Sequence, residues 1–184
     1  LAARAPQPDL VVDPQARAMA VRGADGRLQI VGAKSNGFGA SQWLLADADA
    51  RAPMEAQGAA RCDRDGCVAT LPDGRAVALV FERAALAEDC GRAAVVVTRW
   101  RTQGLCAGPD LVIDGATLDE SGAISARIAG QGFALVRDRA NGYDRPWAPG
   151  PRRAEDRQVP NPQARTAPPP EPHDEADPTL YAPE

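Results

Sequence analysis

The stretch that decides the fold runs from Arg75 to Ile113 and reads RAVALVFERAALAEDCGRAAVVVTRWRTQGLCAGPDLVI. It contains three short apolar runs, at 76–81, 94–97 and 111–113, and valine is frequent in all of them. Runs of this length and composition predict strands that are covered on both faces, because a strand with one wet face alternates polar with apolar residues.

The segment between the first two runs, 82–90, predicts a helix. Ala85, Leu86 and Cys90 recur there at helical spacing and form its expected inner face, and Gly91 predicts its C-terminal end. Its solvent face is expected to carry Glu82, Glu88 and Asp89. Strand, helix and strand in this order predict a parallel β-α-β crossover and the start of a second one.

Antiparallel elements flank this crossover. Expected hairpins pair 18–22 with 28–31 across Asp25-Gly26, 67–71 with 75–80 across Pro72-Asp73-Gly74, and 124–128 with 133–137 across Gly130-Gln131-Gly132. We also expect a strand at 10–13, a loop at 49–61 and helices at 40–48 and 116–121. In the helix at 40–48, Ser41 is the expected cap, and Trp43, Leu44 and Leu45 are expected to face inward. The sequence therefore predicts an α/β (α+β layered) domain with a mixed sheet, hairpins and β-α-β crossovers.

The 184 residues divide into an N-terminal lead (1–8), a folded domain (9–149) and a Pro-rich acidic tail (150–184). The tail predicts disorder, because it has too little apolar surface to bury. The net charge is −4, and most of it lies in the tail. The nearly neutral body argues against a dedicated DNA-binding module. Because the chain begins at Leu1 and not at Met, we expect it to be a piece of a longer protein.

The four cysteines are spaced C-x4-C and C-x15-C, and the sequence alone leaves three pairings open. We favour the local pairing, Cys62 with Cys67 and Cys90 with Cys106, because it closes loops at a hairpin and at the crossover. A zinc site usually draws its thiolates from two C-x2-C knuckles, which this spacing does not provide, and four buried free thiols are the other alternative. Disulfides would place the domain outside the cytosol.

The only histidine, His173, lies in the predicted tail. Histidine-activated nucleophiles and histidine-rich metal sites need an imidazole inside the fold, so we expect no catalytic residue, no metal and no cofactor. A carboxylate site stays open, because several aspartates stand at turns or strand ends: Asp63, Asp65, Asp73, Asp110, Asp114 and Asp119. Such residues more often cap helices and form turns.

Arg99, Trp100 and Arg101 follow the second central strand and form the candidate nucleic-acid contact. A tryptophan can stack on a base while neighbouring arginines bind phosphates. The alternative is an ordinary amphipathic strand end.

Four segments carry a resemblance to a known family: 62–80 (CDRDGCVATLPDGRAVALV), 85–100 (ALAEDCGRAAVVVTRW), 110–123 (DLVIDGATLDESGA) and 143–149 (YDRPWAP). With the Cys-containing loop before 110, they resemble the C-terminal soluble region of ComEC-family competence proteins of alphaproteobacteria over residues 9–149. The resemblance implies a metallo-β-lactamase-like fold on the periplasmic side of an inner-membrane channel that carries single-stranded DNA inward. The family's H-x-H-x-D-H motif is missing, and TRWRTQG at 98–104 stands where a later histidine-rich turn would lie. The resemblance therefore implies a degenerate, non-catalytic domain.

As partners the resemblance implies the transmembrane channel portion of the same full-length chain and, weakly, single-stranded DNA, with no small-molecule substrate. The role would be structural or weakly DNA-guiding. Two alternatives stay open. One is a stand-alone secreted interaction domain, and the other is a carboxylate- and metal-dependent hydrolase.

Overall fold

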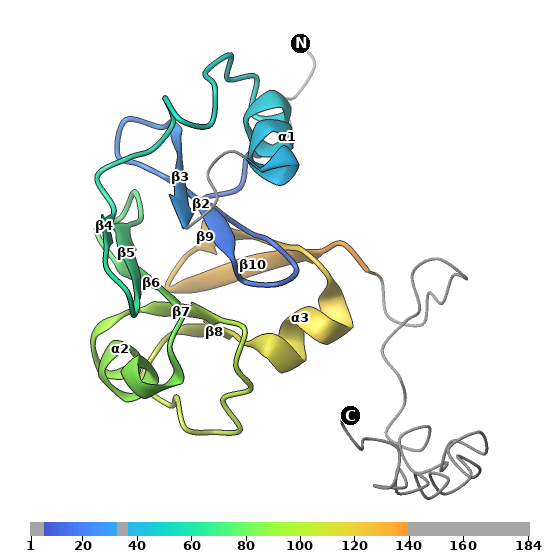
Figure 1. Cartoon of the computed structure of the whole chain (residues 1–184). Coiled ribbons are helices and arrows are strands. Elements are labelled where there is room, and N and C mark those ends of the chain that lie inside the picture. Colours follow the sequence, from blue (N-terminus) through green and yellow to red (C-terminus); the bar gives the residue numbers. More distant parts are fainter. Residues whose placement is uncertain (1–5, 33–36, 140–184) are drawn as a thin grey trace, which may run out of the picture. The chain divides into compact units, whose positions relative to one another are not determined.

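The computed structural model describes residues 6–32 and 37–139, and within them the chain forms two five-stranded sheets and three α-helices (Figure 1). The predicted tail at 150–184, with His173, and the YDRPWAP segment at 143–149 lie outside the described residues. Mixed α/β architecture is thus confirmed for the described part of the chain.

The first sheet is antiparallel throughout and has the strand order β10-β9-β1-β2-β3. Its strands are β1 (Leu10–Val12), β2 (Ala18–Arg22), β3 (Leu28–Gly32), β9 (Ile124–Ala129) and β10 (Gly132–Arg137). The predicted hairpins β2-β3 and β9-β10 are confirmed, and β1 lies between them. Gly26 occupies the turn of the first hairpin with φ of 77°, a conformation that favours glycine.

The second sheet is mixed and has the order β4-β5-β6-β7-β8. Its strands are β4 (Arg61–Cys62), β5 (Gly66–Thr70), β6 (Ala76–Val80), β7 (Val95–Thr98) and β8 (Leu111–Ile113). The first three pair antiparallel, whereas β6, β7 and β8 pair in parallel. The predicted crossover from β6 to β7 is therefore confirmed.

The two sheets pack against each other through one central core. Alternate residues of the strands supply it, among them Met19 and Val21 of β2 and Val77 and Leu79 of β6, all fully buried. The intervening residues of β6 and β7 are also buried, but on the outer face, as the valine-rich runs predict.

Helices cover the outer faces. α1 (Phe38–Ala46) buries Ala40 and Leu44 against β2 and β3, and α2 (Leu86–Arg92) buries Leu86 and Cys90 against β6 and β7. The layers thus follow the order helix, sheet, sheet, helix, with α1 and α2 on opposite sides of the paired sheets (Figure 1). α3 (Gly115–Ser121) connects β8 of one sheet to β9 of the other and contributes Leu118 to the central core.

A buried ion pair fixes the end of α1 to the first sheet. Arg22 of β2 donates two hydrogen bonds to the carboxylate of Asp47, at 2.7 and 3.1 Å, and the two side chains are each 9% exposed. The same guanidinium donates to the carbonyl oxygens of Pro8 and Gly26. These bonds satisfy a charge that would otherwise be costly to bury.

Four details of the prediction differ from the structure. The mixed sheet is present as the second sheet, but the hairpins at the two ends of the chain lie in an antiparallel sheet of their own, because they join through β1. The helix expected at 40–48 begins at Phe38, with Gly37 at its N-cap position and no side-chain cap, so Ser41 is an interior residue. Leu45 does not face inward and is 71% exposed. β4 begins at Arg61, inside the expected loop.

The central helix also departs from its prediction. Its first turn is a 3₁₀ segment, η1 (Arg83–Ala85), and α2 continues through Gly91 to Arg92. Gly91 therefore does not end the helix, and the backbone turns to an extended conformation at Ala93. Asp89, expected on the solvent face, is half-buried. Among the described residues, no helix has the length and apolar character needed to cross a bilayer.

Candidate functional site

The candidate DNA-contact residues lie where the parallel strands end. Arg99, Trp100 and Arg101 follow β7, Phe81 follows β6 and Asp114 follows β8. The carboxyl ends of parallel strands share one edge of a sheet, the usual place for ligand sites in open α/β sheets. Sequence reasoning thus selected an edge suited to a site.

Each of the three side chains already has a partner inside the fold. The guanidinium carbon of Arg99 lies 4.7 Å from the centroid of the Trp100 ring, and the indole Nε1 of Trp100 donates a 2.9 Å hydrogen bond to the carbonyl of Phe81. Trp100 is half-buried and packs against the α2 cluster. Arg101 forms an ion pair with Asp119 of α3. A strand of DNA would have to compete with these contacts.

Asp114 holds this edge together. One of its carboxylate oxygens accepts hydrogen bonds from the backbone N–H and hydroxyl of Thr102, at 2.9 and 3.0 Å. The other accepts from the N–H and hydroxyl of Thr117, both at 2.9 Å, and so caps α3. Burial by itself raises the pKa of Asp114, but the hydrogen bonds from Thr102 and Thr117 outweigh it and hold the pKa below its usual range.

Close backbone approach reinforces the same edge. A Cβ on Gly115 would meet the carbonyl oxygen of Arg99 at 2.2 Å, so only glycine lets α3 begin there. On the other side of the loop, a disulfide joins Cys106 to Cys90 of α2. The loop over 99–110 is therefore held near its start by the close approach to Gly115 and farther along by the disulfide at Cys106.

Three of the remaining candidate aspartates, at 65, 73 and 110, form ion pairs with arginines. Asp73 and Asp110 both pair with Arg75, at 2.7 and 3.0 Å, and Asp65 pairs with Arg64. In the part of the chain that the structure describes, no cluster of three or more His, Cys, Asp or Glu residues could hold a metal ion. The contact of Asp73 is local, as the turn interpretation expects, whereas Asp110 pairs with an arginine 35 residues away.

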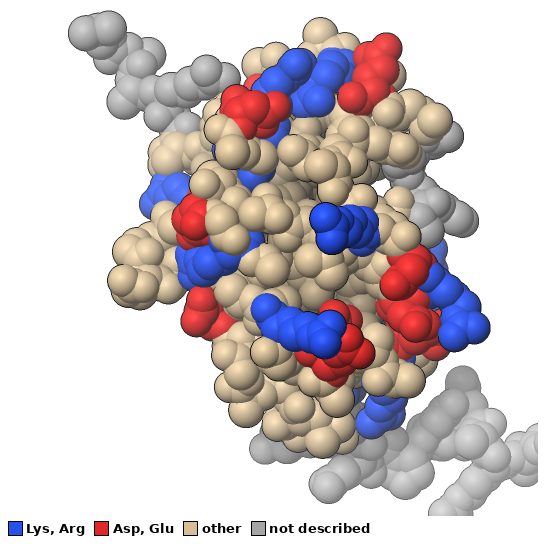
Figure 2. Space-filling view, turned by 90° about the vertical axis from the view of Figure 1, so that its left-hand side faces the viewer, with Lys and Arg blue, Asp and Glu red and all other residues tan. Residues whose placement is uncertain are grey.

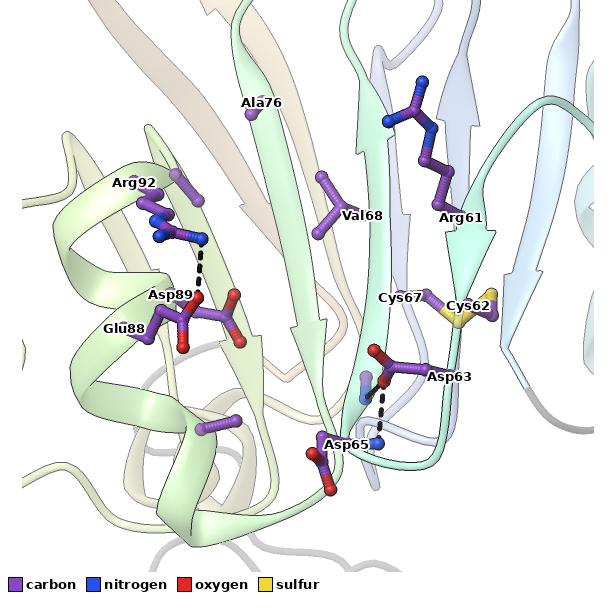
Figure 3. Close-up of a pocket in the computed structure, with 13 residues that line it drawn as sticks. Arg61, Cys62, Asp63, Asp65, Cys67, Val68, Ala76, Glu88, Asp89 and Arg92 are labelled. Carbon is purple, nitrogen blue, oxygen red and sulfur yellow. Dashed lines mark hydrogen bonds and ion pairs between the residues drawn. A yellow bond between two sulfur atoms is a disulfide. The ribbon is translucent and has the colours of Figure 1, made fainter.

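A hollow lies elsewhere, on the outer face of the second sheet (Figure 3). It is a groove of about 450 Å³ between α2 and the β4-β5 hairpin, and a disulfide joins Cys62 to Cys67 on its far wall. The floor includes Val68 of β5 and Ala76 of β6, and Val68 is 42% exposed. We call this feature the β5 groove.

Charged side chains line both walls of the β5 groove. Glu88, Asp89 and Arg92 come from α2, and Arg61, Asp63 and Asp65 come from β4 and the following turn. Figure 3 shows Arg61 and Arg92 toward the Ala76 end and Asp63 and Asp65 toward the opposite end. The two arginines of the groove therefore lie toward one end, and the two aspartates of the hairpin wall lie toward the other.

The pKa values of two of these carboxylates are shifted in opposite directions. Asp63 accepts hydrogen bonds from the backbone N–H groups of Gly66 and Asp65, which lower its pKa. Burial raises the pKa of Asp89, and the negative charges of Glu88, Asp63 and Asp65 raise it further. The structure gives the Asp89 carboxylate no hydrogen-bond or ion-pair partner among the described residues.

The face seen in Figure 2 intersperses basic and acidic side chains and shows no broad basic tract. Such a face does not provide the continuous positive path that a nucleic-acid backbone follows. The view agrees with the nearly neutral body that composition predicts.

Sequence reasoning missed the β5 groove. The sequence predicts Glu88 and Asp89 on the solvent face of a helix and Asp63 and Asp65 at turns or strand ends, whereas the fold places both pairs across one hollow. One signal was available, because Val68 alternates with the inward residues Cys67 and Ala69 and must therefore face outward.

Comparison of the chain with protein-family models, with curated proteins and with solved structures returned no match.

Proposed function

We propose that this chain is a non-catalytic domain from the C-terminal soluble region of a ComEC-family competence protein, with a degenerate metallo-β-lactamase-like fold. It lies on the periplasmic side of the inner membrane and has a structural role beside the transmembrane channel portion of the same full-length chain. The observation that carries the proposal is the series of segments at 62–80, 85–100 and 110–123, which resemble that family.

Three features of the fold support this proposal. The run β6, α2, β7 and β8 has the β-α-β order that the resemblance implies. The two disulfides suit an oxidising compartment. At the edge where the resembled hydrolases carry histidine ligands, this chain carries Thr98 to Gly104, and Thr98, Trp100 and Thr102 bond to the fold itself.

The gene tests the proposal most directly. We expect the reading frame upstream of Leu1 to encode a series of hydrophobic transmembrane helices. In a naturally transformable host, deletion of this domain from the full-length gene should lower the transformation frequency, because the channel loses a structural part. Asp110→Asn should leave that frequency unchanged, because within the described residues the Asp110 side chain pairs only with Arg75.

Two outcomes would contradict the proposal. An upstream frame without hydrophobic helices would favour the stand-alone secreted interaction domain. A loss of transformation in Asp110→Asn, with magnesium-dependent DNA cleavage by the parent domain that the variant lacks, would favour the carboxylate- and metal-dependent hydrolase.

Weak guidance of single-stranded DNA is the second candidate function, because Arg99 and Arg101 are exposed at the carboxyl edge of the parallel strands. Two phosphate contacts predict that affinity falls about sevenfold between about 50 and 200 mM salt. We expect Arg99→Gln with Arg101→Gln to abolish this salt dependence, measured by fluorescence anisotropy of a labelled oligonucleotide.

The matched control replaces Arg83 and Arg137, which are exposed but lie on other elements. If the control pair loses as much affinity as the Arg99 and Arg101 pair, binding is non-specific and the guiding role is wrong. Absence of binding at the lower salt concentration would also end this candidate.

A further inference from the structure

The outer face of the second sheet is only partly covered. α2 packs on β6 and β7 through Leu86 and Cys90 and does not extend over β5. The outward residues of β5 are Gly66, Val68 and Thr70, none of which is buried. Val68 is 42% exposed, so a strip of sheet with one apolar side chain at its centre stays open along the β5 groove.

The charges beside this strip exclude one class of partner. Four carboxylates, Asp63, Asp65, Glu88 and Asp89, line the β5 groove, against the two guanidinium groups of Arg61 and Arg92. Arg92 is already paired with Glu88. A polyanion such as DNA would be repelled, because like charges at short range oppose binding.

The same charges fit a cationic side chain at one end. Asp63 and Asp65 stand on the hairpin wall, where Asp65 is paired with the exposed Arg64. On the α2 wall, the Asp89 carboxylate has no hydrogen-bond or ion-pair partner in the part of the chain that the structure describes. A guanidinium or ammonium group between these walls would relieve their mutual repulsion and form charge-assisted hydrogen bonds. At the Ala76 end, Arg61 has no ion pair among the described residues and can receive a carboxylate.

The length of β5 matches that of a short extended peptide. β5 has five residues, and an extended pentapeptide spans about 17 Å, the length of such a strand. In an extended peptide, residues 1, 3 and 5 point to one face. A cation at the first position would meet the acidic walls, and an apolar side chain at the third would meet Val68. Arg61 is the register partner of Val68 on β4, and its side chain extends toward the Ala76 end (Figure 3), where an anion at the fifth position would meet it.

We propose that the β5 groove binds an extended polypeptide segment that carries arginine or lysine at one end, an apolar side chain at its centre and a carboxylate at the other end. The groove would recognise the side chains of this segment, so it is a docking site for a protein partner. This site is independent of the channel assignment, since it rests on the geometry of the groove alone.

The probe is the capped pentapeptide acetyl-Arg-Ala-Leu-Ala-Glu-amide, titrated to millimolar concentration into ¹⁵N-labelled protein. We expect the amide signals of Gly66, Val68 and Ala76 to shift. Acetyl-Glu-Ala-Leu-Ala-Glu-amide, without the cation, and acetyl-Arg-Ala-Ser-Ala-Glu-amide, without the apolar centre, should bind at least about fivefold more weakly, a difference of about 1 kcal/mol each.

Protein variants test the same contacts from the other side. Asp89→Asn keeps the shape of the side chain and removes one charge from the groove, so we expect about fivefold weaker binding. Glu120→Gln on α3 removes one exposed charge outside the groove and should bind as the parent does. Val68→Thr should weaken binding through loss of the apolar contact, and unchanged signals in the central core will show that each variant is folded.

Three results would overturn the proposal that the β5 groove binds a peptide. The first is no shift at Gly66, Val68 or Ala76 with millimolar peptide, and the second is equal binding of the peptide that lacks the cation. The third is a shift of the same signals by an oligothymidine in place of the peptide, which would make the occupant a nucleic acid. None of these results bears on the channel role, which the upstream reading frame decides.

Discussion

Replacing Asp47 by alanine is expected to lower the free energy of unfolding by about 3 to 5 kcal/mol, the usual loss when one partner of a buried ion pair is removed. The guanidinium of Arg22 would stay buried between β2 and the end of α1 with two of its hydrogen bonds missing. Urea unfolding followed by circular dichroism measures the change.

Asp119→Ala is the matched control, because it removes one partner of an exposed pair with Arg101. Exposed pairs contribute about 0 to 1 kcal/mol, so this loss should be much smaller. A second variant, Arg22→Leu with Asp47→Leu, removes both charges and should cost less than Asp47→Ala alone. If Asp47→Ala costs no more than Asp119→Ala, the pair does not hold α1 in place.

Loss of the Asp114 carboxylate is expected to destabilise the domain by about 2 to 4 kcal/mol at neutral pH, through the lost helix cap and the hydrogen bonds to a charged group. The informative variant is Asp114→Asn, because it keeps the size of the side chain. Its NH₂ group cannot accept from the donors of Thr102 or Thr117, which the carboxylate satisfies on both oxygens.

The pH dependence of this effect has a definite sign. The pKa of Asp114 is lower in the folded chain than its usual value, so the charged form of this carboxylate stabilises the folded state. This stability is present above the unfolded pKa, near about 3.9, and is lost as the pH falls through the folded pKa. The difference in unfolding free energy between the parent and Asp114→Asn should therefore be full at neutral pH and shrink below about pH 4.

Asp138→Asn is the control for this experiment, since Asp138 is exposed and its side chain makes no hydrogen bond in the described part of the chain. A difference between the parent and Asp114→Asn that stays constant from neutral to acid pH would show that the charge of Asp114 contributes nothing. A difference no larger than that of Asp138→Asn would show that the edge is held by other contacts.

Local patterns in the sequence determined most of the elements. The valine-rich runs became β6, β7 and β8, since a run buried on both faces needs no tertiary information to be recognised. The turns at Asp25-Gly26 and Pro72-Asp73-Gly74 predicted their hairpins through backbone conformation alone. The favoured pairing, Cys62 with Cys67 and Cys90 with Cys106, also followed from short spacing, and it is the pairing that the structure has.

Only the tertiary structure decided how these elements share two sheets and where side chains gather. β1 pairs with β9 more than 100 residues later, and no local preference encodes a contact between such distant segments. Trp100 and Arg101 looked free in the sequence, but their partners Phe81 and Asp119 come from other elements. The β5 groove arises because α2 packs over β6 and β7 and leaves β5 uncovered, so Asp89 and Asp65, each ordinary in its own segment, face one hollow. The charged side chains and the exposed Val68 come together in the groove only after folding, because each wall comes from a different segment of the chain.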